Sequence, residues 1–535
     1  MNIGFVNIYP YRPHGHHAKF LEIQAKKLGW KSFSLSCDAA VPHCYLRELK
    51  GSGKLECAKC MVGGLNSFAF DKGDSVRDYF DKNDKANKLY PEHRVFVESS
   101  ALTLTRIESY EQRSSEAVEE KIRRLSPGAS QFYFAAKRWI KHRQLDAVIV
   151  FNGRMDLPRA VIEACKDSGV TFLTHERPLF GNGIILNKNS NCSSLEKIHG
   201  INQAYSEKAL NREQALMAAE LGLQRLSTGN IYEWKRYNPN SVNALSWPLT
   251  NNTVKVLVCP SSKNELLGHP DWETEWHDNT DALDLAVEKG LFDYSDLVVR
   301  FHPSWAVDFG RVSGDLCASH YRQWCEKRGV FFFDSTDTVD TLSLIQMSDV
   351  VVVNGSTVVM EAGLLGKPIL CFGPSSYTFS GVTHDVLSVA DIGLVDMEHI
   401  LSAEPENIIR KTLRIYYSRA VREPVFVDNI RSTLVTECEF YDGANSNILY
   451  QAMFGEEPVI NDDSFSDSEQ FEDKIISLYF SDKPGQNVSD SDFSLDSTLL
   501  NGVDSPRGEQ KKLTVTRKHI YIMLDKLRRL APKGV

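Results

Sequence analysis

Short apolar runs alternate with amphipathic stretches along the first half of the chain. NIGFVNIY and KSFSLSC have the pattern of strands, and HAKFLEIQAKKLGW between them has that of a helix. Further on, LDAVIVF, LPRAVIEACKDSG and VTFLTHE repeat the order strand, helix, strand. This alternation predicts βαβ units around a parallel sheet. Residues from about 79 to 141 are charged with a helical pattern, and we expect an insertion there.

A second series of the same kind follows the Pro/Asn-rich stretch NALSWPLTNN. Its apolar runs are VKVLVCPSS, LVVRFHPS, VFFFDS, DVVVVNGS and KPILCFG, and IIRKTLRIYYSRAV and NILYQAMFG have the pattern of closing helices. We therefore expect an α/β protein with two Rossmann-like domains that face a cleft. The expected bounds are residues 1–248 for the first domain and 249–455 for the second.

The remaining residues have a different composition. Residues 456–510 are rich in Asp, Ser and Glu, which predicts a flexible acidic linker. Residues 511–535 are basic and predict an amphipathic helix that either lies on an anionic membrane surface or packs back on the protein. Its basic residues are Lys511, Lys512, Arg517, Lys518, Lys526, Arg528 and Arg529, and its apolar residues at helical spacing are Ile520, Met523, Leu524, Leu527 and Leu530.

Composition narrows the class of protein. The chain has 535 residues, of which 42% are hydrophobic and 24% charged, with a formal net charge of -9. An acidic chain of this kind is not a general nucleic-acid binder. Neither a secretory leader nor an apolar run of membrane-spanning length is found, and the 11 cysteines form no disulfide-type pattern, so we expect a cytoplasmic protein.

The strand LVVRFHPS ends in polar residues. In open α/β sheets, ligands bind beyond the carboxyl ends of the strands, so Arg300 and His302 are candidates for contact with an anion. A surface arginine and a loop histidine are the alternative. A second apolar strand ends at GST, where Ser356 and Thr357 open a helix that carries Glu361. Backbone N–H groups and hydroxyls at such a position can bind phosphate and Glu361 can reach a ribose, although Ser and Thr are also ordinary helix caps.

Two further groups follow buried strands in the first half. NGRMD places Asn152, Arg154 and Asp156 after one strand, and HER places His175, Glu176 and Arg177 at the end of the next. Because the two strands are expected to be parallel, their tips should open at the same edge of the sheet.

These motifs together resemble a known group of enzymes. The segment GST with EAGLLGKP is similar to the nucleotide-binding half of GT-B glycosyltransferases. The HP and GST pair resembles motifs of transferases that use CMP-activated nonulosonic-type sugars, which include bacterial sialyltransferases and Kdo transferases. A third pair of motifs, NGR…RA followed by ER, resembles motifs of capsular polysaccharide biosynthesis proteins related to Kdo transferases. The resemblance extends with gaps over residues 146–368. The acidic dipeptide-glycine motif of sialyltransferases is missing at its expected place, which disfavours that branch.

The resemblance implies roles for individual residues. His302, Ser356 and Thr357 would hold the CMP phosphate, with Arg300 adding charge. The loop CPSSKNE resembles a serine-rich loop of capsule-synthesis proteins, and a capped helix start is its alternative. Its candidate residues are Ser261, Ser262 and Glu265.

Sugar transfer also needs a carboxylate, as a base for the acceptor hydroxyl or as a nucleophile. Asp156 and Glu176 are the candidates, with a helix cap and an ion pair to Arg154 or Arg177 as their alternatives. Asn152, Arg154 and Arg177 are the candidate substrate-binding residues.

Four cysteines form the pattern C-x6-C-x12-C-x2-C, at Cys37, Cys44, Cys57 and Cys60. Four thiolates suit a closed structural zinc site, and an iron–sulfur cluster needs the same ligands. Unligated thiols in a reducing compartment are the alternative. No catalytic metal is expected.

The sequence thus predicts a cytoplasmic glycosyltransferase that moves a Kdo-like sugar from a CMP-activated donor, with CMP-Kdo favoured, to a surface polysaccharide or glycolipid. The C-terminal helix is expected to hold it at the inner-membrane surface. Three alternatives remain: a GT-B transferase that uses a UDP- or GDP-sugar, a non-hydrolysing UDP-sugar epimerase, and a non-catalytic glycan- or assembly-binding protein of the same fold.

Overall fold

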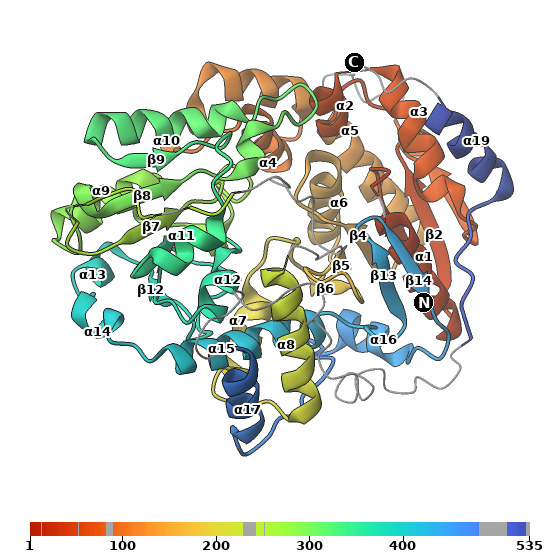
Figure 1. Ribbon diagram of the computed structural model, residues 1–535. Helices are drawn as coiled ribbons and strands as arrows, with labels where there is room; N and C mark the ends of the chain where they lie inside the picture. Colours follow the sequence, from red (N-terminus) through yellow and green to blue (C-terminus); the bar gives the residue numbers. More distant parts are fainter. Residues whose placement is uncertain are drawn as a thin grey trace.

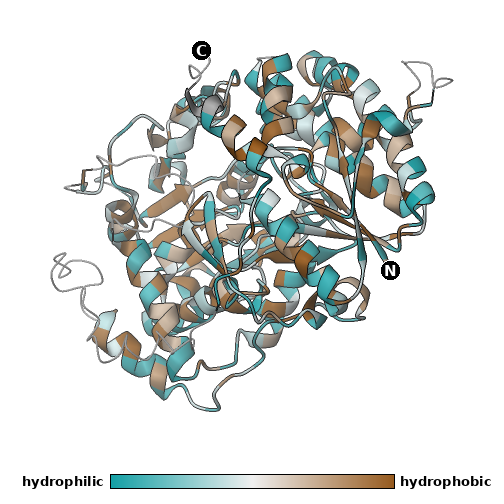
Figure 2. Ribbon diagram, turned by 90° about the vertical axis from the view of Figure 1, so that its right-hand side faces the viewer, coloured by the Kyte–Doolittle hydropathy of each residue, from teal (hydrophilic) through white to brown (hydrophobic). Residues whose placement is uncertain are grey.

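The computed structural model describes residues 1–11, 13–51, 53–81, 89–227, 242–244, 246–250, 252–480 and 511–530. Two six-stranded sheets lie on opposite sides of the molecule, each covered by helices (Figure 1). The strands are hydrophobic and enclosed, while the surrounding helices turn hydrophilic positions outward (Figure 2). The expected α/β architecture of two Rossmann-like domains is confirmed.

The first sheet has the strand order β3-β2-β1-β4-β5-β6. All neighbouring strands are parallel except the antiparallel pair of β5 and β6. Its strands are β1 (Asn2–Val6), β2 (Lys31–Ser36), β3 (Lys72–Ser75), β4 (Ala147–Phe151), β5 (Thr171–Glu176) and β6 (Ile185–Lys188).

The second sheet is parallel throughout, in the order β12-β11-β10-β7-β8-β9. Its strands are β7 (Val256–Cys259), β8 (Leu297–Arg300), β9 (Phe331–Phe333), β10 (Val350–Val353), β11 (Ile369–Phe372) and β12 (His384–Val386). In both sheets the strand order reverses beside the first strand of the series, between β1 and β4 and between β7 and β10. Ligands of doubly wound sheets bind at such switch points.

Helices α1–α6 cover the first sheet. They are α1 (His14–Lys27), α2 (Tyr45–Lys50), α3 (Lys54–Gly63), α4 (Arg94–Thr105), α5 (Glu116–Arg143) and α6 (Asp156–Asp167). The segment expected to be an insertion contains α5, which is the crossover helix between β3 and β4 and packs on α4 and α6. Trp139 of α5 lies so close to β1 that a Cβ at Gly4 would be 2.5 Å from its ring, so glycine is needed there.

The other helices belong mainly to the second half. They are α7 (Glu196–Tyr205), α8 (Arg212–Leu226), α9 (Asn279–Glu288), α10 (Asp315–Arg328), α11 (Thr341–Met347), α12 (Val358–Leu364), α13 (Val389–Ile392), α14 (Met397–Leu401), α15 (Pro405–Tyr417), α16 (Asn447–Phe454), α17 (Gln470–Tyr479) and α19 (His519–Leu530).

The chain passes between the two domains at places other than those expected. Helix α8, expected in the first domain, packs its apolar side on α12 and α15 of the second. Conversely, the hairpin of β13 (Ile430–Leu434) and β14 (Glu437–Phe440) joins α16 against the first sheet. In Figure 1 these late, blue elements lie beside the red and orange first strands. The boundaries 1–248 and 249–455 are therefore corrected.

The expected acidic linker is partly folded. Its residues 481–510 lie outside the described residues, but α17 packs on α8 and α15. Buried Glu472 accepts hydrogen bonds from Arg414 Nε and Nη2, both at 2.8 Å, and from Leu210 N–H at 3.0 Å. Such a buried, fully paired carboxylate fixes the helix in place, so the linker prediction is wrong for residues 470–479.

The C-terminal helix is present as α19 and packs on α3. Arg517 donates to the Val62 carbonyl and pairs with Asp525 at 3.2 Å, and Lys518 N–H donates to Ser67 O at 2.6 Å. Ile520, Met523 and Leu524 point outward, with 62%, 54% and 40% of their surface exposed. Among the described residues, no helix combines the length and apolar character that a membrane span requires.

Candidate functional site

The loops after β7 and β10 meet at the switch point of the second sheet. Ser261 N–H donates to Asn354 Oδ1 at 2.8 Å, and the Ser261 hydroxyl donates to the Asn354 carbonyl at 3.1 Å. The GST loop follows directly, with Gly355 at φ +92°, a conformation that favours glycine. The Ser356 hydroxyl accepts from Val358 N–H at 3.4 Å, and Thr357 is exposed. The strand ends thus bring the two serine-containing loops together, as the sequence pattern predicts.

Glu361 has a partner that the sequence did not indicate. Arg225 Nε, from the last turn of α8, lies 2.9 Å from Glu361 Oε1. The other carboxylate oxygen of Glu361, Oε2, is buried without a hydrogen-bond partner. One oxygen is therefore held in place while the second remains available to a ligand hydroxyl. Nothing in the local pattern around Arg225 marks this role.

His302 lies at the carboxyl end of β8, as expected. Its Nδ1 accepts from Ser304 N–H at 3.1 Å, which leaves the proton of the neutral ring on Nε2. Burial, followed by the charge of Arg300, lowers the pKa of His302 to about 4. The imidazole is therefore neutral at pH 7 and can act toward a phosphate as a hydrogen-bond donor rather than as a cation.

Arg300 does not extend toward a ligand. Its two terminal nitrogens donate to the carbonyls of Asp334 and Asp337, at 2.6 and 3.0 Å, in the loop after β9. Both carbonyls belong to the second domain itself, so Arg300 braces that loop. The expectation that it adds charge directly to a phosphate site is corrected.

The loop CPSSKNE is tied to the first domain by Glu108, another residue that sequence reasoning missed. Lys263 N–H and Asn264 Nδ2 donate to the two oxygens of Glu108, at 2.8 and 2.7 Å. Glu108 is 1% exposed, and burial raises its pKa to about 7. In the same loop, Ser262 accepts from the Trp305 indole N–H at 2.7 Å. These contacts give the loop a structural role between the domains.

The tips of β4 and β5 open at the same edge of the first sheet, as predicted. Asn152 Nδ2 donates to Glu176 Oε2 at 3.0 Å, while Oε1 accepts from Arg177 N–H at 3.0 Å and lies 3.2 Å from His14 Nε2. Burial raises the pKa of Glu176 and outweighs these hydrogen bonds, which lower it. A carboxylate with a raised pKa suits proton transfer near neutral pH. Arg177 itself is buried, and its guanidinium donates to the Pro178 carbonyl at 3.5 Å.

Arg154 crosses from the first domain to the second. Its Nη1 donates to the hydroxyls of Ser99 and Thr103, at 2.9 and 3.0 Å, and to the Glu265 carbonyl at 3.0 Å. The two switch-point edges therefore meet through Arg154 and Glu265. This contact places the Asn152–Glu176 edge opposite the edge that carries His302.

Asp156 lies inside the first domain, with 0% of its surface exposed. Its Oδ1 accepts from the Tyr9 hydroxyl and its Oδ2 from Tyr45 N–H at 2.9 Å. Burial raises its pKa to about 6. With both oxygens occupied, Asp156 joins α6 to the loop after β1 and to α2, which is the structural role that the sequence left as its alternative.

The four cysteines surround one small cavity, but they do not assemble into a closed site. Cys57 and Cys60 lie within α3, so their C-x2-C spacing forms a helix face rather than the turn of a zinc knuckle. Among the described residues, the group of at least three metal-ligand side chains within 4.8 Å of one another consists of histidines, not of these thiols. The arrangement therefore does not provide the tetrahedral thiolate site that the spacing predicts.

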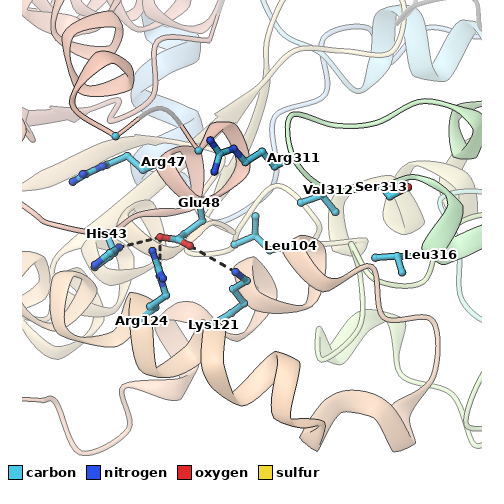
Figure 3. A pocket seen from close by; sticks show the side chains of 12 residues that line it. His43, Arg47, Glu48, Leu104, Lys121, Arg124, Arg311, Val312, Ser313 and Leu316 are labelled. Atoms are coloured by element: carbon cyan, nitrogen blue, oxygen red, sulfur yellow. Dashed lines mark hydrogen bonds and ion pairs between the residues drawn. The ribbon is translucent and has the colours of Figure 1, made fainter. Parts of the chain in front are cut away.

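A separate cavity of about 590 Å³ lies where α2 and α5 meet the loop that precedes α10 (Figure 3). Its charged lining residues are His43, Arg47, Glu48, Lys121, Arg124 and Arg311. Glu48 is paired there with His43, Lys121 and Arg124. None of the residues predicted to bind the nucleotide lines this cavity, so it lies outside the candidate site.

Comparisons with known proteins bear on the second domain. Residues 262–391 match a family described as "Capsule polysaccharide biosynthesis protein". No curated protein matches the chain. Similar solved structures include the KpsC β-Kdo 2,4 transferase of Thermosulfurimonas dismutans, with 11% identity over 56% of this chain and 83% of that one and a TM-score of 0.31.

Two other solved structures are similar at the same low level. The UDP-GlcNAc 2-epimerase of Neisseria meningitidis is 12% identical over 77% of this chain and 94% of that one, with a TM-score of 0.27. The glycosyltransferase SnogD of Streptomyces nogalater is 9% identical over 78% and 94%, with a TM-score of 0.22. These likenesses are too distant to carry an argument about activity. The family match is informative, because residues 262–391 include His302, the GST loop and Glu361: over this segment the chain resembles capsule polysaccharide biosynthesis proteins, as its motifs predict.

Proposed function

We propose that the protein is a glycosyltransferase that moves a Kdo-like sugar from a CMP-activated donor to a surface polysaccharide or glycolipid. The observation that carries this proposal is the family match over residues 262–391, which contains His302 and the GST loop at the carboxyl edge of the second sheet. The Arg154–Glu265 contact brings that edge to the Asn152–Glu176 edge of the first sheet. A donor bound to one edge would thus face an acceptor bound to the other.

The donor phosphate would be held by the loops after β8 and β10. In this proposal the neutral His302 ring and the hydroxyls of Ser356 and Thr357 donate hydrogen bonds to the phosphate oxygens. These donors stabilise the negative charge that develops as the bond between phosphate and sugar breaks. Oε2 of Glu361 accepts from a ribose hydroxyl, while Ser261, Ser262 and Glu265 form the adjoining wall of the donor site.

The acceptor would bind at the edge of the first sheet, beside Asn152, Arg154 and Arg177. Its hydroxyl oxygen forms the new bond to the anomeric carbon, and CMP leaves with the bonding electrons. In an inverting reaction Glu176 takes the hydroxyl proton; in a retaining one a carboxylate first bonds to the anomeric carbon. Glu176 is the preferred group, because its side chain is partly exposed at the strand edge whereas Asp156 is fully buried.

A panel of nucleotide sugars tests the donor. We expect the purified chain to hydrolyse CMP-Kdo slowly without acceptor and to leave UDP- and GDP-sugars intact, with CMP release measured by chromatography. His302→Gln should abolish this release, whereas His320→Gln, at a half-buried histidine of α10 in the same domain, should not. Hydrolysis of UDP- or GDP-sugars alone would replace the CMP donor. Binding without turnover of any donor would favour a non-catalytic glycan-binding protein.

We also propose that the protein works at the cytoplasmic surface of the inner membrane. The outward-facing apolar residues Ile520, Met523 and Leu524 on α19 support this proposal. A helix with such a face among basic residues can lie among the headgroups of anionic lipids. An acceptor linked to lipid would be concentrated at that surface.

A further inference from the structure

Three histidines beneath the edge of the first sheet form a cluster that the proposed transfer does not use. His14 and His17 lie one turn apart on α1 and therefore share a face of that helix. His175 is the penultimate residue of β5. One ligand atom from each residue lies within 4.8 Å of the other two. The side chains belong to residues that are 2%, 0% and 1% exposed, so water does not reach the cluster from outside.

The hydrogen-bond partners of these rings follow one pattern. His14 Nε2 lies 3.2 Å from Glu176 Oε1, and His17 Nε2 lies 3.7 Å from the Cys438 sulfur of β14. The Nδ1 atoms of both rings are buried without a hydrogen-bond partner, and so are both nitrogens of His175. In both α1 histidines, therefore, Nε2 contacts a neighbouring side chain and Nδ1 has no hydrogen-bond partner. Leaving a buried polar atom unpaired costs about 1–3 kcal/mol, and one ligand shared by the three rings would remove this cost.

The surroundings of the cluster favour neutral imidazoles. The ring of Phe151 packs against His14 and His175, with centroids 4.1 and 5.7 Å apart. Burial lowers the pKa of all three histidines below its ordinary value. Neutral imidazole is the form that binds metal ions, and it suits zinc, copper, iron and nickel.

We propose that His14, His17 and His175 together bind one divalent transition-metal ion, with zinc as the reference ion. The ion would bind the unpaired Nδ1 atoms of His14 and His17 and one nitrogen of His175. The contact of His14 Nε2 with Glu176 is then the carboxylate partner that metal-bound histidines commonly have. Zn–N bonds are about 2.0–2.1 Å long, so the rings need only to draw together from their present spacing.

Such an ion would connect segments that are far apart in the sequence. Its ligands come from α1 and β5, and Cys438 behind His17 belongs to the hairpin that returns from the second domain. The site would therefore fasten this hairpin to the first sheet and fix the orientation of Glu176. It goes beyond the proposed transfer, which needs no metal, and it differs from the cysteine site that the sequence predicts.

Metal content provides the test. We expect the full chain, purified with a histidine-free tag and without chelator, to contain about one equivalent of zinc by elemental analysis. Protein stripped by a chelator should take up one equivalent of Zn²⁺ in competition with a chromophoric chelator, and its thermal midpoint should rise with Zn²⁺ concentration. His17→Gln and His175→Gln should lose the equivalent. Glu176→Gln should bind Zn²⁺ about 10- to 100-fold more weakly, as expected for the partner of a ligand.

Two controls locate the ion. His320→Gln and the double variant Cys57→Ser/Cys60→Ser should keep the full equivalent. The proposal is overturned if the wild-type chain takes up no equivalent, or if folded His17→Gln and His175→Gln retain it. Should these variants fail to fold, Co²⁺ in the wild-type chain still decides: a spectrum without thiolate charge transfer supports the histidines, and a thiolate band assigns the ion to the cysteines. None of these measurements depends on nucleotide-sugar turnover, so the metal site can be refuted without refuting the proposed transfer, and the reverse.

Discussion

At the scale of single residues, exposure separates the two candidate carboxylates. Glu176 lies at the strand edge with its side chain 26% exposed and its carboxylate oriented by Asn152, whereas Asp156 is fully buried. We expect Glu176→Gln to lower kcat at least about 100-fold, the usual loss for a general base, with little change in CMP affinity. Asp156→Asn should instead lower the thermal midpoint. Its amide nitrogen replaces one carboxylate oxygen and cannot accept a hydrogen bond, so the bond from either Tyr9 or Tyr45 is lost. Transfer assays and CMP calorimetry on both variants provide the measurement. Normal turnover in Glu176→Gln would place the base elsewhere.

The positions of site residues at this scale could be predicted, but their partners could not. Asn152, Glu176 and His302 follow apolar runs, and a buried strand end is visible in the pattern of the sequence. The roles of Arg300 and Asp156 could not be predicted, since their partners lie in segments distant in the sequence: backbone carbonyls after β9 for Arg300, and the Tyr9 hydroxyl and Tyr45 N–H for Asp156. Arg225 pairs with Glu361 although the two residues are more than a hundred positions apart, and the spacing of apolar residues along the chain does not predict such a contact.

At the scale of elements, the contact between two loops contains a group that titrates near neutral pH. Glu108, in the loop after α4, accepts from the loop after β7, and burial raises its pKa from 4.5 to about 7. The folded state therefore holds this proton more tightly than the unfolded state. Stability falls as pH rises through the window from about 4.5 to 7, by roughly 3 kcal/mol at about 1.4 kcal/mol per pKa unit.

We therefore expect Glu108→Gln to reduce the loss of stability between pH 5 and pH 8. Urea midpoints at the two pH values provide the measurement. Glu98→Gln is the matched control: Arg113 and Arg94 outweigh the effect of burial and lower the pKa of Glu98, so it is ionised over this range in both states. An equal pH dependence in wild type and Glu108→Gln would show that another group is responsible.

Elements with a strong period were predicted well, and those that depend on distant partners were not. The strands β1, β2, β4 and β5, the strands β7 to β11 and the helices α1 and α6 are visible in the apolar pattern, whereas the short strands β3, β6 and β12 are not. Helix α17 was not, because its acidic composition resembles that of a linker. Its structure depends on Arg414, which pairs with Glu472 from α15. In the same way, the C-x2-C spacing indicated a knuckle, while the segment folds as helix α3.

At the scale of the whole molecule, each sheet is completed by chain from the other half. Helix α8 packs on the second domain, and the β13–β14 hairpin with α16 packs on the first. Both sheets could be predicted as separate units, since each is encoded by a local series of strands. The exchange of segments could not be predicted. The apolar face of a helix or hairpin does not by itself indicate which of the two domains it packs on. The C-terminal segment adds to the first domain in the same manner, through Leu513 and Val515.

This docking of the C-terminal segment agrees with one of the two interpretations of its helix, in which it packs back on the protein. Polar contacts of Arg517 and Lys518 hold α19 to the first domain, while Ile520, Met523 and Leu524 remain exposed at i, i+3 and i+4 spacing. The helix therefore packs back on the protein and leaves an apolar face exposed. Removal of residues 511–535 would disturb both properties at once, so substitutions in the exposed face give the cleaner test.

We expect the full chain to sediment with anionic vesicles at low salt and to be released as salt screens the basic residues, each of which contributes about 1 kcal/mol near the surface. Ile520→Asp/Met523→Asp should weaken partitioning at least about tenfold, because burying one such side chain contributes about 1.5–3 kcal/mol. Leu394→Asp is the matched control, since this leucine is 79% exposed and lies in the second domain. Thermal midpoints of the variants should equal that of wild type, because the substituted side chains point to solvent. Equal sedimentation of the double variant and the control would show that α19 serves only to complete the first domain.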